Sequence, residues 1–537
     1  MSIPQSTIYI CSSVRLNSRY EHTIYFADRT AQHNYFAGKV VKTFSAYSFI
    51  RKSWDLNVAA TMEEAAAWSY LFFKNSANGR AYYYFIDNIE YINDGTVRLK
   101  LQIDVIQTYL FGDDVTLLPC FVDRCHTLTD DAVTHTVDEG LETGDLVDNG
   151  VFHWGQLNDK CILVLSTINP NYTETEKPVP AFAGSYNGVF SGLKVWAVDS
   201  VDWQEWGNQL EALTAKYGSD GIVSMWVYPK ALVDLGGENE WGDDDLCKTV
   251  DGAKGAGAFL PFDKPPTTVD GYTPKNKKLL TYPYSFLYVS NNCGGSAVYR
   301  WERFAPYNQP QFTTAGTISP EGVVKMFPVR YNHLDASGHY EHGLTIGGFP
   351  TCAWDTDLYK MWLAQNQNQL NVAGFTAGAS VVGGAVAAVA SLATGNLIGA
   401  GAGAMTAIGG AQKIASMLAQ KKDMVIQPPQ AKGSFSSNVN ITAGRHTFSF
   451  YKKSVSAEYA KIIDDYFTMY GYKVSRVQPL TLKARKSHTY IKTIGCHIKA
   501  NLCNEDATKI ESIFDNGVTF WTDGDRIGEY FDDNSTL

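Results

Sequence analysis

The chain has 537 residues, 45% of them apolar and 19% charged, so it is too long for a single core and should form three or more packed units. These proportions are typical of a folded globular protein and exclude collagen-like, disordered and linker-dominated chains. The net charge of −10 argues against a protein whose main task is to bind nucleic-acid phosphates, because that affinity rests on Lys and Arg.

The N-terminal part of the chain contains one predicted helix and one predicted β-hairpin. Thr61 and Glu64 form a capping-box pattern, which predicts a helix over 65–73. Residues 82–92 are rich in aromatic and β-branched side chains, and apolar and polar residues alternate after the turn signal at 93–95. This period of two predicts a half-buried hairpin that ends near residue 105.

Outside these two elements the chain is predicted to be mostly strand. Helices are expected over 201–217, over 457–470 and from Asn504 onward. In the second of these helices one stripe is expected to face the core, before a Gly471 C-cap; it consists of Tyr459, Ile463, Tyr466, Phe467 and Tyr470. Further strands are expected over 7–14, 160–166, 222–228, 285–290, 297–304 and 446–451, with turns at 187–188, 270–271 and 516–517. The predicted fold class is mainly β with a few helices, in a β-rich multidomain protein.

One segment differs from this β-rich pattern. Residues 361–412 contain no Asp, Glu, Lys, Arg or His, and Gly and Ala occupy 23 of the 40 positions from 372 to 411. As a helix, 372–393 would be about 33 Å long, enough for a hydrocarbon core of about 30 Å, whereas 397–412 would reach only about 24 Å. Glycines spaced four apart offer close-packing faces for helix pairs in lipid.

Three interpretations of this segment are open: a buried core helix pair, a constitutive transmembrane hairpin, and a conditional segment that is stored in an oligomer and released into a bilayer. Ten glycines in 40 residues make a poor permanent helix, and the scarcity of Leu, Ile and Phe argues against stable membrane residence. The conditional segment is therefore favoured. Its candidate membrane-active residues are Val372, Gly374, Phe375, Gly378, Val381, Val382, Val386, Val389, Leu392, Gly395, Leu397, Ile398, Gly399, Gly403, Met405 and Ile408.

Six short motifs, taken in their order along the chain, resemble a known family. They are Ile103-Asp104-Val105-Ile106-Gln107-Thr108-Tyr109, Asp138-Glu139-Gly140-Leu141, Tyr282-Pro283-Tyr284, Ile426-Gln427-Pro428-Pro429-Gln430, Tyr470-Gly471-Tyr472-Lys473 with Arg476-Val477, and Ile513-Phe514-Asp515-Asn516-Gly517 with Trp521. In these motifs and their order, the chain resembles the tail knob proteins of small short-tailed bacteriophages of Gram-positive hosts (Salasmaviridae type). The resemblance covers about 1–145 and 410–537, and the middle of the chain shares only the Tyr-Pro-Tyr motif.

The resemblance implies a hexameric, β-rich tube at the distal end of the virion tail, through which genomic DNA leaves without specific binding. It implies that six apolar loops plug the tube and are released to penetrate the host membrane. The implied partners are other copies of the chain, the upper tube or collar, the tip protein and host membrane lipid. The implied domains are an N-terminal tube domain (1–150), a middle β-rich part (151–355), the membrane-active loop (356–430) and a C-terminal return to the tube (431–537).

The sequence predicts no enzyme, cofactor or metal site. The histidines at 333, 339 and 342 fit a polar loop better than a zinc site, and the groups Cys120/Cys125/His126 and Cys496/His497/Cys503 lack ligand spacing. Nine cysteines without a Cys-x-x-Cys pair indicate assembly in a reducing host cytoplasm. The alternative functions are a cell-wall hydrolase or receptor-binding module of the tail, and a free-standing pore-forming protein.

Overall fold

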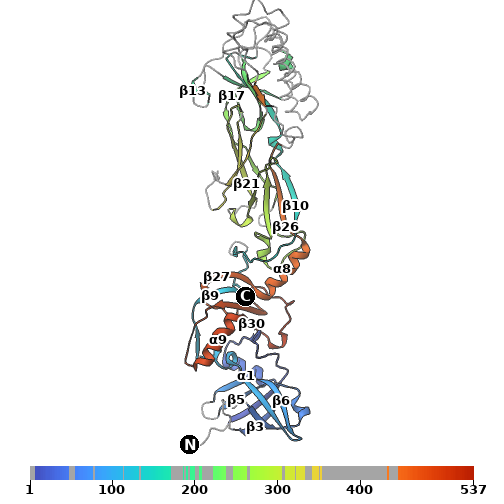
Figure 1. The fold of residues 1–537 in the computed structure, drawn as a ribbon, viewed down its shortest axis with the longest axis vertical. Helices are drawn as coiled ribbons and strands as arrows, with labels where there is room; N and C mark the ends of the chain where they lie inside the picture. Colours follow the sequence, from blue (N-terminus) through green and yellow to red (C-terminus); the bar gives the residue numbers. More distant parts are fainter. Residues whose placement is uncertain are drawn as a thin grey trace, which may run out of the picture. The chain divides into compact units, whose positions relative to one another are not determined.

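The chain folds into two compact units in this computed structural model, and each is built from separate stretches of sequence. Unit 1 comprises Met1–Asp145, Thr268–Tyr284 and Val455–Leu537, and unit 2 comprises Leu146–Thr267 and Ser285–Ser454. The structure describes residues 6–47, 55–75, 79–112, 114–131, 135–167, 169–170, 185–186, 189–190, 194–199, 205–208, 222–236, 246–262, 266–304, 309–320, 322–332, 342–349, 351–353, 432–434 and 446–537. Most of the described elements are strands, as the fold-class prediction required (Figure 1).

The two main sheets of unit 1 share one hydrophobic core, and a second, smaller core contains residues of 268–284 and of the helix at 457–470. The first sheet has the order β3-β1-β5-β6-β7-β4 and is formed by β1 (Ser6–Ser12), β3 (Val40–Tyr47), β4 (Asp55–Ala59), β5 (Trp68–Asn75), β6 (Ala81–Asn93) and β7 (Thr96–Ile103). The second has the order β2-β30-β28-β9-β27 and is formed by β2 (His22–Ile24), β9 (Cys120–Cys125), β27 (Tyr472–Gln478), β28 (His488–Ile494) and β30 (Val518–Trp521). A short pair joins β8 (Val115–Leu117) to β29 (Ile498–Ala500).

The helices of unit 1 are α1 (Arg29–Ala37), α2 (Met62–Ala65), the π-helical turn η2 (Ile106–Leu110), α8 (Ala457–Tyr470) and α9 (Asn504–Asn516), with short 3₁₀ turns at η5 (Lys277–Leu280) and η8 (Gly524–Arg526). Helix α9 buries Ile510, Ile513 and Phe514 in the same core as the strands of both sheets. This core therefore joins the first and the last parts of the chain, which is why the N-terminal and C-terminal stretches fold as one unit.

Unit 2 is built from three sheets. The largest has the order β16-β17-β14-β11-β15-β24-β25, with β11 (Lys160–Ser166), β14 (Lys194–Asp199), β15 (Ile222–Pro229), β16 (Val233–Leu235), β17 (Cys247–Ala253), β24 (Thr351–Ala353) and β25 (Lys432–Ser434). The second, β10-β26-β19-β20, contains β10 (Leu146–His153), β19 (Ser285–Ser290), β20 (Ser296–Tyr299) and β26 (Ser449–Val455). The third, β18-β21-β22-β23, contains β18 (Gly257–Phe259), β21 (Gln311–Gly316), β22 (Val324–Val329) and β23 (Leu344–Ile346).

Shorter elements complete unit 2. They are the two-stranded β12 (Ser185–Tyr186) and β13 (Val189–Phe190) and the 3₁₀ turns η3 (Gly155–Leu157), η4 (Lys230–Leu232) and η6 (Trp301–Arg303). All seven residues of β11 are buried, and this strand lies between β14 and β15 in the largest sheet. Its apolar run from Cys161 to Leu165 is typical of a strand that is covered on both faces.

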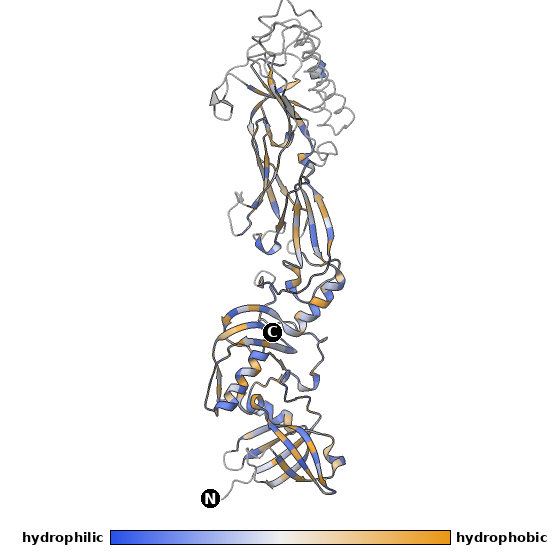
Figure 2. Cartoon of the chain, viewed as in Figure 1, coloured by the Kyte–Doolittle hydropathy of each residue, from blue (hydrophilic) through white to orange (hydrophobic). Residues whose placement is uncertain are grey.

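The predicted hairpin is confirmed by β6 and β7, which pair antiparallel and meet at Asn93↔Thr96. Along β7 the residues Val97, Leu99, Leu101 and Ile103 are buried, while the side chains between them are not. Figure 2 shows hydrophobic and hydrophilic residues alternating along the strands of this sheet. The period of two therefore identified both the element and its buried face.

The predicted helix over 65–73 is wrong. The capping box at Thr61 and Glu64 is present, but it starts a helix of only four residues, α2, and Trp68–Asn75 is a strand. The four residues from Tyr70 to Phe73 are all buried and β5 pairs with β1 on one side and β6 on the other. Packing between two partner strands overrides the local helix signal, because aromatic residues gain more from sheet burial than from a solvent-facing helix turn.

Helix α8 has the predicted bounds, with Ser456 as its N-cap and Gly471 as its C-cap. Its buried face differs in part from the predicted stripe: Ile463 and Phe467 are buried, but Tyr459 and Tyr470 are more than a third exposed, and Asp464 and Thr468 are buried instead. The helix from Asn504 is confirmed as α9. The predicted strands over 297–304 and 446–451 are shifted, because β20 ends at Tyr299 and β26 begins at Ser449.

Some predictions fall partly or wholly outside the described residues. Residues 205–208 of the predicted helix over 201–217 are helical, and the rest of that range is not described. The turn at 187–188 and the whole uncharged segment 361–412 lie outside the described residues.

Replacing Gly471 by Ala should lower the free energy of unfolding by about 3 kcal/mol, because two effects add. The backbone there has φ 66° and ψ −153°, a region that is essentially restricted to Gly. In addition, a Cβ would lie 2.3 Å from the backbone oxygen of Cys125. Urea unfolding of purified variants measures the loss.

Gly140→Ala is the matched control, since Gly140 also has a positive φ (68°) but no atom within 4 Å of the added Cβ. Its loss should be about 1 kcal/mol. Equal losses in the two variants would show that the close contact with Cys125 does not contribute to the destabilisation by Gly471→Ala.

Candidate functional site: the Glu139 cluster

The predicted membrane-active residues, from Val372 to Ile408, all lie outside the described residues. The strands that flank this region are described: β24 pairs antiparallel with β25, with Ala353 opposite Lys432. The chain therefore leaves the largest sheet of unit 2 at residue 353 and returns at residue 432 to the neighbouring strand.

Two further findings concern the described residues alone. Among them, no helix is both long enough and apolar enough to cross a bilayer. In the same part of the chain, no group of three or more His, Cys, Asp or Glu side chains is placed to hold a metal ion.

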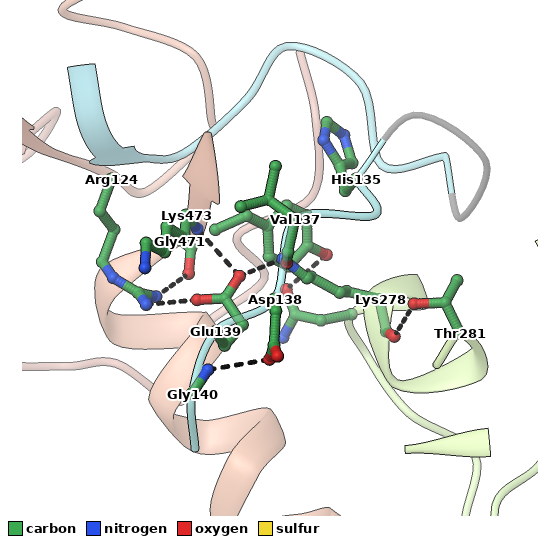
Figure 3. A network of polar contacts seen from close by, with 12 residues as sticks. Arg124, His135, Val137, Asp138, Glu139, Gly140, Lys278, Thr281, Gly471 and Lys473 are labelled. Carbon is green, nitrogen blue, oxygen red and sulfur yellow. Dashed lines mark hydrogen bonds and ion pairs between the residues drawn. The ribbon is translucent and has the colours of Figure 1, made fainter. Parts of the chain in front are cut away.

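The described residues contain a buried ionic site that we call the Glu139 cluster: Arg124, Glu139, Lys278, Gly471 and Lys473. The Glu139 side chain is completely buried and forms ion pairs with both Arg124 and Lys278. Its Oε1 also accepts a hydrogen bond from the Lys473 backbone N–H at 2.9 Å. Figure 3 shows these groups converging on one carboxylate from three different stretches of the chain.

The two cations of the cluster have further acceptors. The Arg124 guanidinium donates to the Gly471 carbonyl at 2.9 Å, and the Lys278 ammonium donates to the Val137 carbonyl at 2.6 Å. Arg124 also lies over the Tyr466 ring, 4.9 Å from its centroid. Burial lowers the pKa of Lys278, and the neighbouring Glu139 carboxylate opposes this shift.

A second buried carboxylate, Asp464 on α8, holds the same middle segment. It accepts hydrogen bonds from the Tyr272 hydroxyl at 2.8 Å and from the backbone N–H groups of Lys275 and Asn276 at 2.7 and 3.0 Å. Asp464 is fully buried. Residues 268–284 are therefore fastened to the C-terminal stretch by Asp464 and to the N-terminal stretch by Glu139.

The chemistry of the Glu139 cluster is structural. Both carboxylate oxygens are engaged by cations or by a backbone N–H, so neither is left to accept a proton from a substrate. Charged groups in a low-dielectric interior are stable only when they are paired and hydrogen-bonded. The cluster therefore positions three distant chain segments relative to one another.

A third buried carboxylate, Asp104, organises the first motif of the family resemblance. Its two oxygens accept hydrogen bonds from the Tyr70 hydroxyl at 2.9 Å and the Gln107 N–H at 3.0 Å. Gln107 in turn donates to the Ile24 carbonyl at 2.9 Å, and Tyr109 donates to Asp506 on α9 at 2.9 Å. Burial raises the pKa of Asp104 to about 6.

The structure brings together motifs that the sequence shows only as separate pieces. Glu139 comes from the Asp-Glu-Gly-Leu motif, and Gly471 and Lys473 from the Tyr-Gly-Tyr-Lys motif, while Tyr284 of the Tyr-Pro-Tyr motif packs on Phe467 of α8. Sequence reasoning missed Arg124 and Lys278. The only local signal for Arg124 is a charged residue in a strand between two buried cysteines, Cys120 and Cys125.

Comparison with known proteins gives consistent similarities along the whole chain. The family model described as Bacillus phage phi29, Tail knob protein gp9, C-terminal domain, matches residues 256–535, which is more than half of the chain. A model of the caudoviral major tail protein N-terminus matches residues 4–114.

Three proteins that match this chain over nearly their whole length are tail knob proteins. The chain is 26% identical to the tail knob protein gp9 of Bacillus phage B103, over 97% of both chains, and 25% identical to that of phage phi29, over 98% of both. The solved structure of the bacteriophage C1 tail knob protein, gp12, matches 99% of this chain and 100% of its own with a TM-score of 0.67 at 14% identity, which establishes a similar fold.

Glu139→Gln should lower the free energy of unfolding by about 3–5 kcal/mol, because it leaves two buried cations without a counter-charge. Adding Lys278→Met should recover part of this loss, since one of the unpaired charges is then removed. Glu142→Gln, at an exposed carboxylate nearby, is the matched control and should change stability by less than about 0.5 kcal/mol. A double variant no more stable than the single one would refute the ionic explanation.

Deprotonation of Asp104 should lower the free energy of unfolding as the pH rises from about 4 to 6. Its folded pKa of about 6 lies above the ordinary value of 3.8, so the native state binds the proton more tightly and this contribution is lost above pH 6. The free energy of unfolding of Asp104→Asn minus that of the wild type should therefore increase by about 3 kcal/mol between pH 4 and 7. Urea unfolding at several pH values measures the difference, with exposed Asp55→Asn as the control for loss of one negative charge. A pH-independent difference between wild type and Asp104→Asn would contradict the assignment.

Proposed function

The chain belongs to the tail knob protein family represented by gp9 of Bacillus phage phi29, and from that membership we propose that it forms a hexameric tube for DNA ejection at the distal end of the virion tail. It is a structural component of a phage tail. In the proposed assembly, six apolar loops plug the lumen and are released to penetrate the host membrane.

The observation that carries this proposal is the uncharged segment 361–412 together with its flanking strands. A segment without one ionisable side chain is compatible with hydrocarbon, and its Gly and Ala content lets it pack closely elsewhere first. Because β24 and β25 are neighbours in one sheet, the segment can leave and return as a single tethered hairpin. Storage among symmetry-related copies would remove the solubility penalty of an exposed apolar surface.

The charge of the chain supports a conduit for DNA. Six copies would carry a net charge of about −60, and a lumen of that sign repels phosphate, so DNA would slide without adhering. The other proposed partners are the upper tube or collar and the tip protein. Buried thiols at Cys11, Cys161 and Cys496 support assembly in a reducing host cytoplasm. We assign no catalytic step to the chain.

Deletion of 372–411 should leave assembled tubes that no longer release dye from liposomes. A finer variant, Val382→Lys with Val386→Lys, should also abolish leakage, because each charge costs about 2.5–3.5 kcal/mol at a helix centre in the bilayer. The matched control is the pair Val298→Lys and Val323→Lys at exposed positions of unit 2, which should leak like the wild type.

Electron microscopy of each variant separates assembly from leakage. Closed six-fold cylinders in solution are expected for all of them. Unchanged leakage after the deletion would end the membrane proposal. Rings formed only on liposomes by a lone subunit would favour a free-standing pore-forming protein, and clearing of a purified cell-wall suspension would favour a hydrolase.

A further inference from the structure

Unit 1 contains a cavity of about 590 Å³ that the family relationship does not explain. Its charged lining consists of the cations Arg485, Lys275 and Lys277 and the carboxylates Asp130, Asp532 and Asp533. The other lining residues include His126, Asn276 and Thr468. This volume is within the range of small-molecule sites in proteins.

Arg485 is the unusual group of this cavity. The residue is only 4% exposed, and no acidic side chain of the described residues lies within ion-pair distance of its guanidinium. Its Nε is buried and has no hydrogen-bond partner in the described part of the chain. An unpaired buried charge is strongly destabilising, so the guanidinium requires a counter-ion that the described residues do not supply.

Two more cations face the same space. Lys275 and Lys277 lie on the 268–284 segment, and their backbones are held by hydrogen bonds to Asp464 at 2.7 Å and to Asp130 at 3.3 Å. Across the described ranges neither ammonium group forms an ion pair. The backbone anchors therefore present two available positive charges beside the buried one.

The acidic residues of the cavity wall are already engaged. Asp532 pairs with Arg526 at 3.1 Å, and Asp533 pairs with Lys486 at 3.0 Å. Asp130 accepts hydrogen bonds from the Tyr472 hydroxyl and the Lys277 N–H. None of these carboxylates forms an ion pair with Arg485, and Asp532 and Asp533 have cationic partners outside the lining. Asp130 has only neutral donors, so it offsets one of the three positive charges of the lining and two remain.

We propose that this cavity is a binding site for a free phosphate-class oxyanion, with Arg485 as the buried ligand and Lys275 and Lys277 at its rim. A planar guanidinium presents paired N–H donors that match two oxygens of a phosphate, and the exposed residues Lys275 and Lys277 add two positive charges at the rim. The almost complete burial of Arg485 favours a small free anion over the backbone of a DNA duplex, which cannot follow it into the wall.

The test is a phosphate titration of the full chain in a low-salt buffer without other oxyanions, followed by ³¹P NMR and thermal unfolding. Inorganic phosphate should bind in a saturable way and raise the unfolding temperature. Arg485→Gln should weaken binding at least tenfold. Because that variant alters a buried residue, the exposed double variant Lys275→Gln/Lys277→Gln provides an independent test and should weaken binding several-fold.

The matched control is Lys461→Gln/Lys499→Gln, which removes two exposed charges of unit 1 away from the cavity and should bind phosphate as the wild type does. Absence of saturable binding at millimolar phosphate would overturn the proposal, as would equal affinity in the rim variant and the control. Displacement of bound phosphate by a short DNA duplex at equal phosphate concentration would overturn the assignment to a free anion.

Discussion

The burial of Glu139 between Arg124 and Lys278 is the constraint on which the arrangement of unit 1 depends. Arg124 and Glu139 belong to the N-terminal stretch and Lys278 to residues 268–284. The C-terminal stretch supplies the Gly471 carbonyl to Arg124 and the Lys473 N–H to Glu139, and any of the three charges would be costly in isolation. The three stretches must therefore meet in one geometry. Asp464 fixes the position of the same middle segment through uncharged donors, since its oxygens accept hydrogen bonds from the backbone N–H groups of residues 275 and 276.

This anchoring matters because unit 1 is discontinuous in sequence. The chain enters unit 2 after Asp145, returns for residues 268–284, leaves again and comes back at Val455. A short returning segment has little apolar surface with which to secure itself, and its core contribution is confined to a few residues such as Val269, Leu279 and Tyr284. Directional polar contacts supply the remaining specificity.

The same segment supplies Lys275 and Lys277 to the cavity beside Arg485, in a chain whose net charge is −10. The proposed anion site and the proposed apolar loop rest on different residues: the first on cations of unit 1, the second on an uncharged segment whose flanking strands belong to unit 2. A tail subunit can therefore repel DNA through its net charge and still retain a small anion locally.

Features that depend only on neighbouring residues could be recognised in the sequence. They are the alternation along β7, the Ser456 and Gly471 caps of α8 and the uncharged stretch 361–412. Tertiary structure decided the rest. The capping box at Thr61 could not reveal that residues 68–75 would lie between two partner strands, and no spacing joins Arg124 to Glu139 and Lys278. Periodicity and capping are local, whereas desolvation and charge pairing depend on which distant segments come to lie side by side.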